Sequence, residues 1–230
     1  MKEIYQMTKE EVQKQYQAGM GLSSAEAQKR MERYGRNQLT EQKKKSIGIV
    51  FAGQFADLLV IILIIAAVIS MFSGNPESTI VILAVIVLNA VLGTVQYVKA
   101  EKSLEALKKL SSPHAKVIRD GKKQEIPSEE IVPGDLLILE AGDLTAADGR
   151  LLESHSLQVN ESSLTGESAN VEKIDEMIPG EVPLGDRKNM VFSGSLVTYG
   201  RGMVLVTATG MDTEIGKIAR LMNNTKEKRT

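Results

Sequence analysis

Two long apolar runs stand out in a chain whose other parts mix hydrophobic and polar residues. Residues 47–72 contain one charged residue, Asp57, and residues 80–98 contain none. A helix needs about 20 mostly apolar residues to cross the hydrocarbon core of a bilayer. Each run therefore predicts a transmembrane helix, and the short link 73–79, with its Gly, Asn and Pro, predicts a tight turn between them. A pair of buried core helices is the alternative interpretation of the same pattern.

Lysines flank the two runs unevenly, which predicts their orientation. The link 73–79 has no Lys or Arg, whereas lysines occur on both outer flanks, at Lys43, Lys44, Lys45, Lys99, Lys102, Lys108 and Lys109. Positively charged flanks stay on the cytoplasmic side of a membrane. We therefore expect a multi-pass protein of the cell membrane with both termini in the cytoplasm. The first run begins too late and is too long for a cleaved signal peptide.

The second helix is expected to continue beyond the membrane. Residues 97–110 keep apolar side chains at helical spacing with charges between them. This pattern predicts a cytoplasmic stalk that ends at Ser111, Ser112 and Pro113, because proline stops a helix. An amphipathic helix resting on a soluble domain is equally compatible with the pattern.

The N-terminal segment predicts two short helices. Thr8 and Glu11 have the spacing of a capping box, in which each side chain satisfies the other residue's backbone N–H. Ser23 or Ser24 opens a second helix, which Gly35 ends. We interpret this segment as a helical cap on another domain.

From about residue 115 to residue 209 the pattern changes to short strands separated by turns. Asp120-Gly121 predicts a hairpin, and a turn at 133–135 precedes an apolar strand over 136–139. Two further strands are predicted within 190–200 and 201–210, followed by a helix over 215–222. Turns at this regular spacing are typical of a small β-sandwich or distorted jelly roll.

The expected organisation follows in chain order. It comprises a helical part of the soluble domain (1–46), a first transmembrane helix (47–72), an extracytoplasmic loop (73–79), a second transmembrane helix with its stalk (80–110), a β-rich domain (111–222) and a linker (223–230).

Composition removes several function classes. Lys and Arg number 28 against 29 Asp and Glu, so no basic field predicts nucleic acid as a partner. The absence of Cys excludes thiolate metal sites and thiol catalysis. His114 and His155 are isolated from other metal-binding residue types, and no phosphate-binding P-loop motif occurs.

The remaining candidate chemistry lies in Thr165, Gly166, Glu167 and Ser168. Glycine permits positive φ or a close approach to another surface. A carboxylate exposed beside it could accept a proton from an attacking water. A solvated turn between strands explains the same four residues without any catalytic role.

A series of motifs gives this tetrapeptide a context. They are YGRNQL (34–39), QFADLL (54–59), LNAVLG (88–93), LEALK (104–108), VPGD (132–135), DGR (148–150), NESSLTGES (160–168), GS (194–195) and TGMDTEIGK (209–217). In this order around a membrane hairpin, they make the sequence resemble the N-terminal part of P-type cation-transporting ATPases, most closely the calcium-pump branch.

The resemblance implies an actuator domain. In the family, ATP phosphorylates an aspartate in a DKTGT motif on another domain, and the TGES loop then enters that site. Glu167 would activate the water that hydrolyses the aspartyl phosphate, Gly166 would allow close approach, and Thr165 and Ser168 would shape the loop. ATP and Mg²⁺ would serve the full-length pump. Its phosphorylation and nucleotide-binding domains, its remaining membrane helices, the lipid bilayer and the transported cation would be the partners.

The sequence also departs from the family pattern. It contains no DKTGT motif, so we expect a fragment of a pump that hydrolyses no ATP by itself. Asp57 is the remaining carboxylate at the cytoplasmic end of the first span and a candidate for the ion-entry path, but no metal ligand is assigned. The ion is expected to be Ca²⁺. A pump for Na⁺, H⁺ or Mg²⁺ and a membrane-anchored, non-enzymatic β binding module are the alternatives.

Overall fold

The computed structural model describes residues 2–39, 46–110 and 113–227, and the chain divides into two compact units. Met1–Thr40 and Pro113–Thr230 form one unit, which we call the sheet unit. Glu41–Ser112 form the other, which we call the helical unit. The N-terminal helices thus share a unit with strands that follow more than 70 residues later in the sequence.

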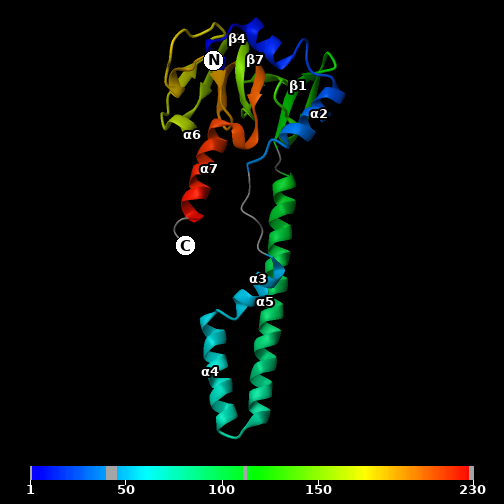
Figure 1. Cartoon of the computed structure of the whole chain (residues 1–230), viewed down its shortest axis with the longest axis vertical. Helices are drawn as coiled ribbons and strands as arrows, with labels where there is room; N and C mark the ends of the chain where they lie inside the picture. The colour runs from blue at the N-terminus through cyan, green and yellow to red at the C-terminus, as the bar shows by residue number, and fades with distance from the viewer. Residues whose placement is uncertain (1, 40–45, 111–112, 228–230) are drawn as a thin grey trace. The chain divides into compact units, whose positions relative to one another are not determined.

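The sheet unit is built on one antiparallel sheet of seven strands (Figure 1). The strand order is β2-β1-β3-β7-β4-β5, and β6 pairs with β4 outside this path. The strands are β1 (His114–Arg119), β2 (Lys122–Pro127), β3 (Leu136–Glu140), β4 (Asp148–Asn160), β5 (Asn170–Glu172), β6 (Met190–Val191) and β7 (Leu196–Ala208). Single 3-10 turns lie at η1 (Ile4–Gln6), η2 (Ser128–Glu130), η3 (Leu184–Asp186) and η4 (Gly210–Asp212).

Two strands of 13 residues, β4 and β7, form the centre of the sheet. The sequence pattern predicted separate strands within 190–200 and 201–210, but β7 runs continuously across both ranges. No strand was predicted where β4 lies. Register shifts interrupt their pairing, and near one of them Ser156 and Gly200 have positive φ angles of 51° and 74°. Such bulges disturb the alternation of apolar and polar residues that identifies a strand in a sequence. These strands nevertheless contribute to the main core, with Leu151 from β4 and Val204 and Val206 from β7.

The helices of the sheet unit follow the predicted end signals. The capping box of α1 (Lys9–Tyr16) is confirmed: Glu11 N donates to Thr8 Oγ1 at 3.3 Å, and Thr8 N donates to Glu11 Oε2 at 2.9 Å. Ser23 caps α2 (Ser24–Tyr34), and Gly35 ends it, as predicted. The predicted hairpin at Asp120-Gly121 is also confirmed, because β1 and β2 pair around it.

The C-terminal helix is longer than the sequence predicted. Residues 215–222 were expected to be helical and 223–230 to be a linker, but α7 spans Glu214–Glu227. The polar side chains after Met222 hide the amphipathic pattern but do not prevent the backbone from continuing as a helix. Residues 228–230 of the expected linker lie outside the described residues.

The helical unit corrects the prediction of one helix over 47–72. This segment forms α3 (Ile47–Gln54) and α4 (Leu58–Phe72), which differ in direction by 60°. The break has a clear physical cause: Asp57 Oδ1 accepts a hydrogen bond from Leu59 N at 2.9 Å and caps the start of α4. A short acidic side chain satisfies the free N–H groups of a helix start, which favours beginning a new helix there.

The third helix, α5 (Pro76–Leu110), is continuous and includes the predicted stalk (Figure 1). It begins inside the expected loop 73–79, because proline at a first helical position needs no hydrogen-bond partner for its nitrogen. Its predicted end at Ser111 and Ser112 lies outside the described residues.

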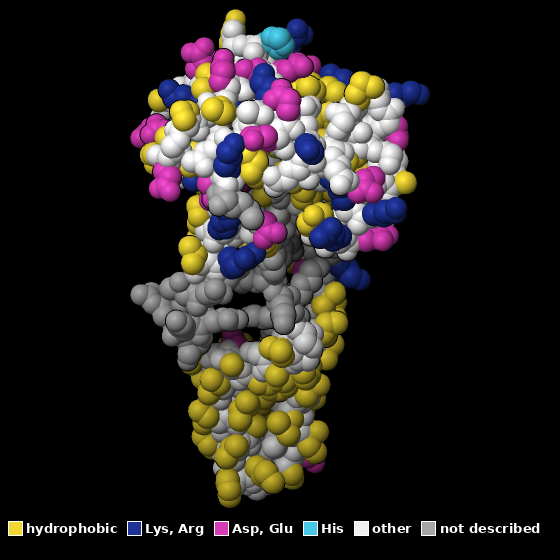
Figure 2. All heavy atoms as spheres, turned by 45° about the horizontal axis from the view of Figure 1, so that its top comes forward, with side chains coloured by type: hydrophobic (Ala, Val, Ile, Leu, Met, Phe, Trp, Pro, Cys, Tyr) yellow, Lys and Arg dark blue, Asp and Glu magenta, His cyan; other side chains and the backbone are white. Residues whose placement is uncertain are grey.

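The helical unit exposes many apolar side chains. Val60, Ala67, Ile86 and Ala90 are buried on α4 and α5, which pack against each other. Many of the other large apolar side chains of these helices are exposed, and Figure 2 shows them covering the visible face of this unit. By length and composition α5 could cross a membrane, and α3 with α4 could form a second, broken span or a re-entrant loop.

Candidate functional site

The TGES segment lies in a compact loop between two paired strands. β4 ends at Asn160 and β5 begins at Asn170, and these two residues are partners in the antiparallel pairing. Between them α6 (Ser162–Thr165) makes a single helical turn, in which the carbonyl of Glu161 accepts from Leu164 N at 2.9 Å and from Thr165 N at 3.0 Å. The loop therefore has internal backbone hydrogen bonds that define its shape.

Gly166 ends this helical turn in the left-handed conformation. Its φ angle is 78°, and its N–H donates to Ser162 O at 3.0 Å. A Cβ at this position would have no neighbouring atom within 4 Å. The glycine is therefore required by the backbone conformation and not by crowding within the domain.

Glu167 follows at the exposed end of the loop. Its N–H donates to Thr165 Oγ1 at 3.3 Å, and Thr165 Oγ1 in turn donates to the carbonyl of Glu161 at 3.1 Å. The Glu167 carboxylate makes no hydrogen bond or ion pair with any residue that the structure describes. This carboxylate is open to a proton donor from outside the domain.

Thr165 and Ser168 shape the loop in different ways. The Thr165 hydroxyl links Glu161 to Glu167, whereas Ser168 contributes its backbone carbonyl, which accepts from Asn160 Nδ2 at 3.1 Å. The structure therefore brings the four predicted residues together on one short exposed segment.

Sequence reasoning missed a buried ion pair beneath this loop. Lys173 Nζ lies 2.5 Å from Glu161 Oε1, and their side chains are 0% and 1% exposed. Burial raises the pKa of Glu161 and lowers the pKa of Lys173, while the attraction between the two groups opposes both changes. The two residues flank the polar segment in the sequence, but only the pairing of β4 with β5 brings them together.

The DGR motif has a structural role. Asp148 accepts from Ser193 N at 2.8 Å and from Glu214 N, the first residue of α7, at 2.7 Å. Burial raises the pKa of Asp148 to about 6. The buried Arg150 donates to the carbonyls of Asp175 and Met7 at 3.1 and 3.4 Å, and burial lowers its pKa to about 10.

Asp135 of the VPGD motif is structural as well. It is fully buried and accepts from Arg119 Nε at 2.8 Å and Nη2 at 2.6 Å. Its Oδ2 also accepts from Val132 N at 2.9 Å. This pair fixes the turn before β3 to the end of β1.

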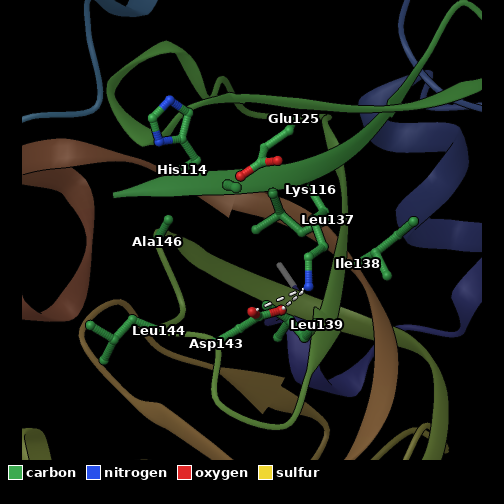
Figure 3. Close-up of a pocket in the computed structure, with 10 residues that line it drawn as sticks. His114, Lys116, Glu125, Leu137, Ile138, Leu139, Asp143, Leu144 and Ala146 are labelled. Atoms are coloured by element: carbon green, nitrogen blue, oxygen red, sulfur yellow. Dashed lines mark hydrogen bonds and ion pairs between the residues drawn. The ribbon is translucent and has the colours of Figure 1, made fainter. Parts of the chain in front are cut away.

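A small cavity lies between β1, β3 and the segment 143–146 (Figure 3). Its volume is about 70 Å³, and Lys116 at its wall already pairs with Asp143 at 3.2 Å. A cavity of this size holds a few water molecules, whereas ligand pockets usually measure about 300–1,000 Å³. No residue of the TGES loop lines it, and of the two histidines only His114 does.

Within residues 2–39, 46–110 and 113–227, no three His, Asp or Glu side chains are placed to hold a metal ion together. Asp57, the candidate for the ion-entry path, is exposed and caps α4.

Comparison with protein families agrees with this geometry. Residues 109–223 match the P-type ATPase actuator domain, and residues 4–70 match the cation transporter/ATPase N-terminus. The chain therefore belongs to the P-type ATPase actuator domain family.

Individual relatives are more specific. The chain is 50% identical over 229 residues to a calcium-transporting ATPase of Listeria monocytogenes, covering 99% of this chain and 26% of the relative. It is 48% identical over 221 residues to calcium-transporting ATPase 1 of Lactococcus lactis, covering 96% of this chain and 25% of that protein. A probable cation-transporting ATPase F of Mycobacterium tuberculosis is 44% identical over 202 residues, which cover 88% of this chain and 22% of that protein. The chain thus spans about a quarter of the length of the curated relatives it matches.

Proposed function

We propose that this chain supplies the actuator domain and the first membrane helices of a P-type ATPase that couples ATP hydrolysis to Ca²⁺ transport. The observation that carries the proposal is the Glu167 carboxylate, exposed at the end of an ordered loop without a partner among the described residues. The actuator-domain match and the relatives named as calcium-transporting ATPases support the enzyme class and the ion.

In the proposed reaction, Glu167 enters a site on another domain of the same pump that carries an aspartyl phosphate. A water oxygen attacks the phosphorus in line, the bond between phosphorus and the aspartate oxygen breaks, and Glu167 accepts a proton from the water. The products are a free aspartate and inorganic phosphate. Positioning and proton acceptance are the contributions that a protein makes to such a transfer. Thr165 and Gly166 set the position of Glu167, and Ser168 holds the returning strand.

We assign residues 1–46 and 111–222 to the actuator domain, with α7 extending it to Glu227. We assign 47–72 and 80–110 to a membrane hairpin with cytoplasmic ends, in which the first span is broken at Asp57 and the extracytoplasmic link within 73–79 is shortened by the start of α5 at Pro76. The exposed apolar side chains of α4 and α5 support contact with lipid. The bulged strands β4 and β7 support a distorted jelly roll for the sheet unit.

ATP and Mg²⁺ have no recognisable binding motif in this chain: the described ranges hold no cluster of metal-binding side chains, and the sequence contains no phosphate-binding P-loop. We therefore assign both to the phosphorylation and nucleotide-binding domains of the longer protein, and the ion ligands to its remaining membrane helices. Asp57 stays a candidate for the ion-entry path.

The function is tested in membrane vesicles containing the full-length protein. We expect ATP to drive uptake of radioactive calcium, and Ca²⁺ to be required for forming a phosphoenzyme that hydroxylamine cleaves, as it cleaves acyl phosphates. ATP-driven transport of Na⁺, H⁺ or Mg²⁺ by these vesicles, without uptake of calcium, would exclude the calcium assignment. Absence of any phosphoenzyme would favour a non-enzymatic binding module.

The 230-residue chain by itself provides a complementary test. We expect the purified chain to hydrolyse no ATP above the background of a mock purification. Sustained hydrolysis that follows the chain through a second purification step would contradict the assignment of the nucleotide site to other domains.

A further inference from the structure

The buried pair Glu161–Lys173 closes the base of the loop that carries Glu167. Glu161 comes directly after β4 and Lys173 directly after β5, and these strands are paired. Lys173 N also donates to Leu157 O at 2.8 Å, which extends the backbone pairing past the last residue of β5. The two side chains then meet at 2.5 Å inside the domain.

A short chain of contacts leads from this pair to the exposed carboxylate. Lys173 holds the side chain of Glu161, and the carbonyl of Glu161 accepts from the Thr165 hydroxyl at 3.1 Å. The same hydroxyl accepts from Glu167 N at 3.3 Å. A change in the backbone of Glu161 therefore moves the Thr165 hydroxyl that holds the backbone of Glu167.

Stability alone does not account for this pair. Removing two charges from water carries a large desolvation cost, and well-packed apolar residues of similar volume are often as stabilising as a buried ion pair. Glu161 Oε2 is buried and has no hydrogen-bond partner among the described residues, and Lys173 Nζ lies over the Phe192 ring, 5.7 Å from its centroid, within cation–π range. What the pair gives that apolar residues cannot is one fixed direction for the side chain of Glu161.

We infer that Glu161 and Lys173 are positioning residues for the dephosphorylation step, acting on Glu167 through Thr165. This inference rests on the proposed function, because it assigns the pair to the same reaction. Neither residue touches the phosphate; the pair fixes the loop that delivers the carboxylate.

The test compares three forms of the full-length pump: wild type, the variant Glu161→Leu with Lys173→Met, and Glu167→Gln. The double variant replaces both charges by apolar side chains of similar length, so that no unpaired buried charge remains. We expect it to unfold at nearly the wild-type temperature and to form phosphoenzyme from ATP at the wild-type rate. We expect its phosphoenzyme to decay about 10-fold more slowly, and hydrogen exchange of the Thr165 and Gly166 amides to be at least about 10-fold faster.

A matched control uses the second buried ion pair of the same domain. Arg119→Met with Asp135→Leu removes a pair of similar burial, 8% and 0% exposed, whose other hydrogen-bond partners, Glu130 O and Val132 N, lie outside the loop. We expect this variant to change neither loop exchange nor the rate of phosphoenzyme decay. If the Glu161→Leu, Lys173→Met variant does not fold, Glu161→Gln with Lys173→Met decides the question, because Gln keeps the shape of Glu161 and no unpaired buried charge remains; slower decay and faster loop exchange are then expected.

Wild-type loop exchange and wild-type decay in the folded variant would overturn the inference, because the pair would then be only structural. Failure of the proposed function has a different signature. In that case Glu167→Gln would also decay at the wild-type rate, and a change in decay of the double variant could not be assigned to Glu167. That result would overturn the inference together with the function, even if loop exchange changed.

Discussion

The turn 132–135 and the loop 161–169 both place a carboxylate between two strands, but in opposite surroundings. Asp135 is fully buried, and its two oxygens accept from Arg119 and from Val132 N. Glu167 is exposed, and its carboxylate has no partner in the described part of the chain. Both belong to the motifs that make the sequence resemble P-type ATPases, so the motif alone does not tell which carboxylate is structural.

The difference teaches that the partners of a carboxylate decide its role. Asp135 has its acceptor sites filled by donors of its own domain and holds a turn in place. In the loop, Glu161 takes the buried position and the cationic partner, Lys173. Glu167 is thereby left on the surface of an ordered segment, where a group from another domain can reach it.

Breaking the Arg119–Asp135 pair should have the largest effect on stability. Arg119→Met leaves Asp135 buried without its cation, and removing one partner of a buried pair costs about 3–5 kcal/mol. Chemical denaturation of the sheet unit measures the loss. Lys217→Met serves as the control, because its pair with Glu214 at 2.7 Å has a lysine that is 56% exposed. Such surface pairs contribute at most about 1 kcal/mol, so an equal loss in both variants would contradict the distinction.

Asp148 should make stability depend on pH. It is buried and held by backbone N–H groups rather than by a cation, and its pKa rises from 3.8 to about 6. Because the folded state binds this proton more tightly than the unfolded state, the contribution is complete below about pH 4. It is lost as the pH rises through 6, and each pKa unit corresponds to about 1.4 kcal/mol.

We therefore expect the free energy of unfolding of the wild type to fall by about 2 kcal/mol between pH 4 and pH 7, relative to Asp148→Asn. Denaturant titrations of both proteins across this range measure the difference. Parallel pH profiles for the two proteins would show that folding does not raise the pKa of Asp148.

Gly166→Ala should have the smallest effect on stability, together with faster amide hydrogen exchange in the loop. The φ angle of 78° costs an L-residue about 1–2 kcal/mol, whereas the surrounding space is open. We expect a loss of about 1 kcal/mol together with faster exchange of the Gly166-position amide, measured by denaturation and by hydrogen exchange. Gly142→Ala is a control of the same kind, since its φ is 96°, its surroundings are equally open, and it lies outside the loop. A change in loop exchange in the Gly142 variant as well would argue against a local effect.

Local signals in the sequence predicted much of the fold. Thr8 and Glu11, Ser23, Gly35 and the Asp120-Gly121 turn each act through neighbours in the sequence, and the structure places each as predicted. The Asp57 break was missed although its signal was present: a short acidic residue before an apolar run caps a helix. The continuous hydrophobicity of 47–72 concealed it.

The parts that the sequence did not predict depend on contacts between distant residues. β4 was missed because its bulge near Ser156 breaks the alternating pattern, and β7 was divided in two because glycines interrupt it at 200 and 202. The loop and its exposed glutamate were predicted from motif and polarity. The Glu161–Lys173 pair was not, because two charged residues in a polar segment are usually solvated, and only the pairing of β4 with β5 brings them together inside the domain.

The most direct test of the central claim is the decay of the phosphoenzyme in the full-length protein after ATP is removed. With Glu167→Gln, phosphoenzyme formation should be unchanged and its decay about 100-fold slower, in line with the contribution of a general base. Glu172→Gln is the matched control, because Glu172 is also an exposed glutamate and lies on β5, outside the loop; its decay should equal that of the wild type. Decay of the Glu167→Gln phosphoenzyme at the wild-type rate would contradict the account.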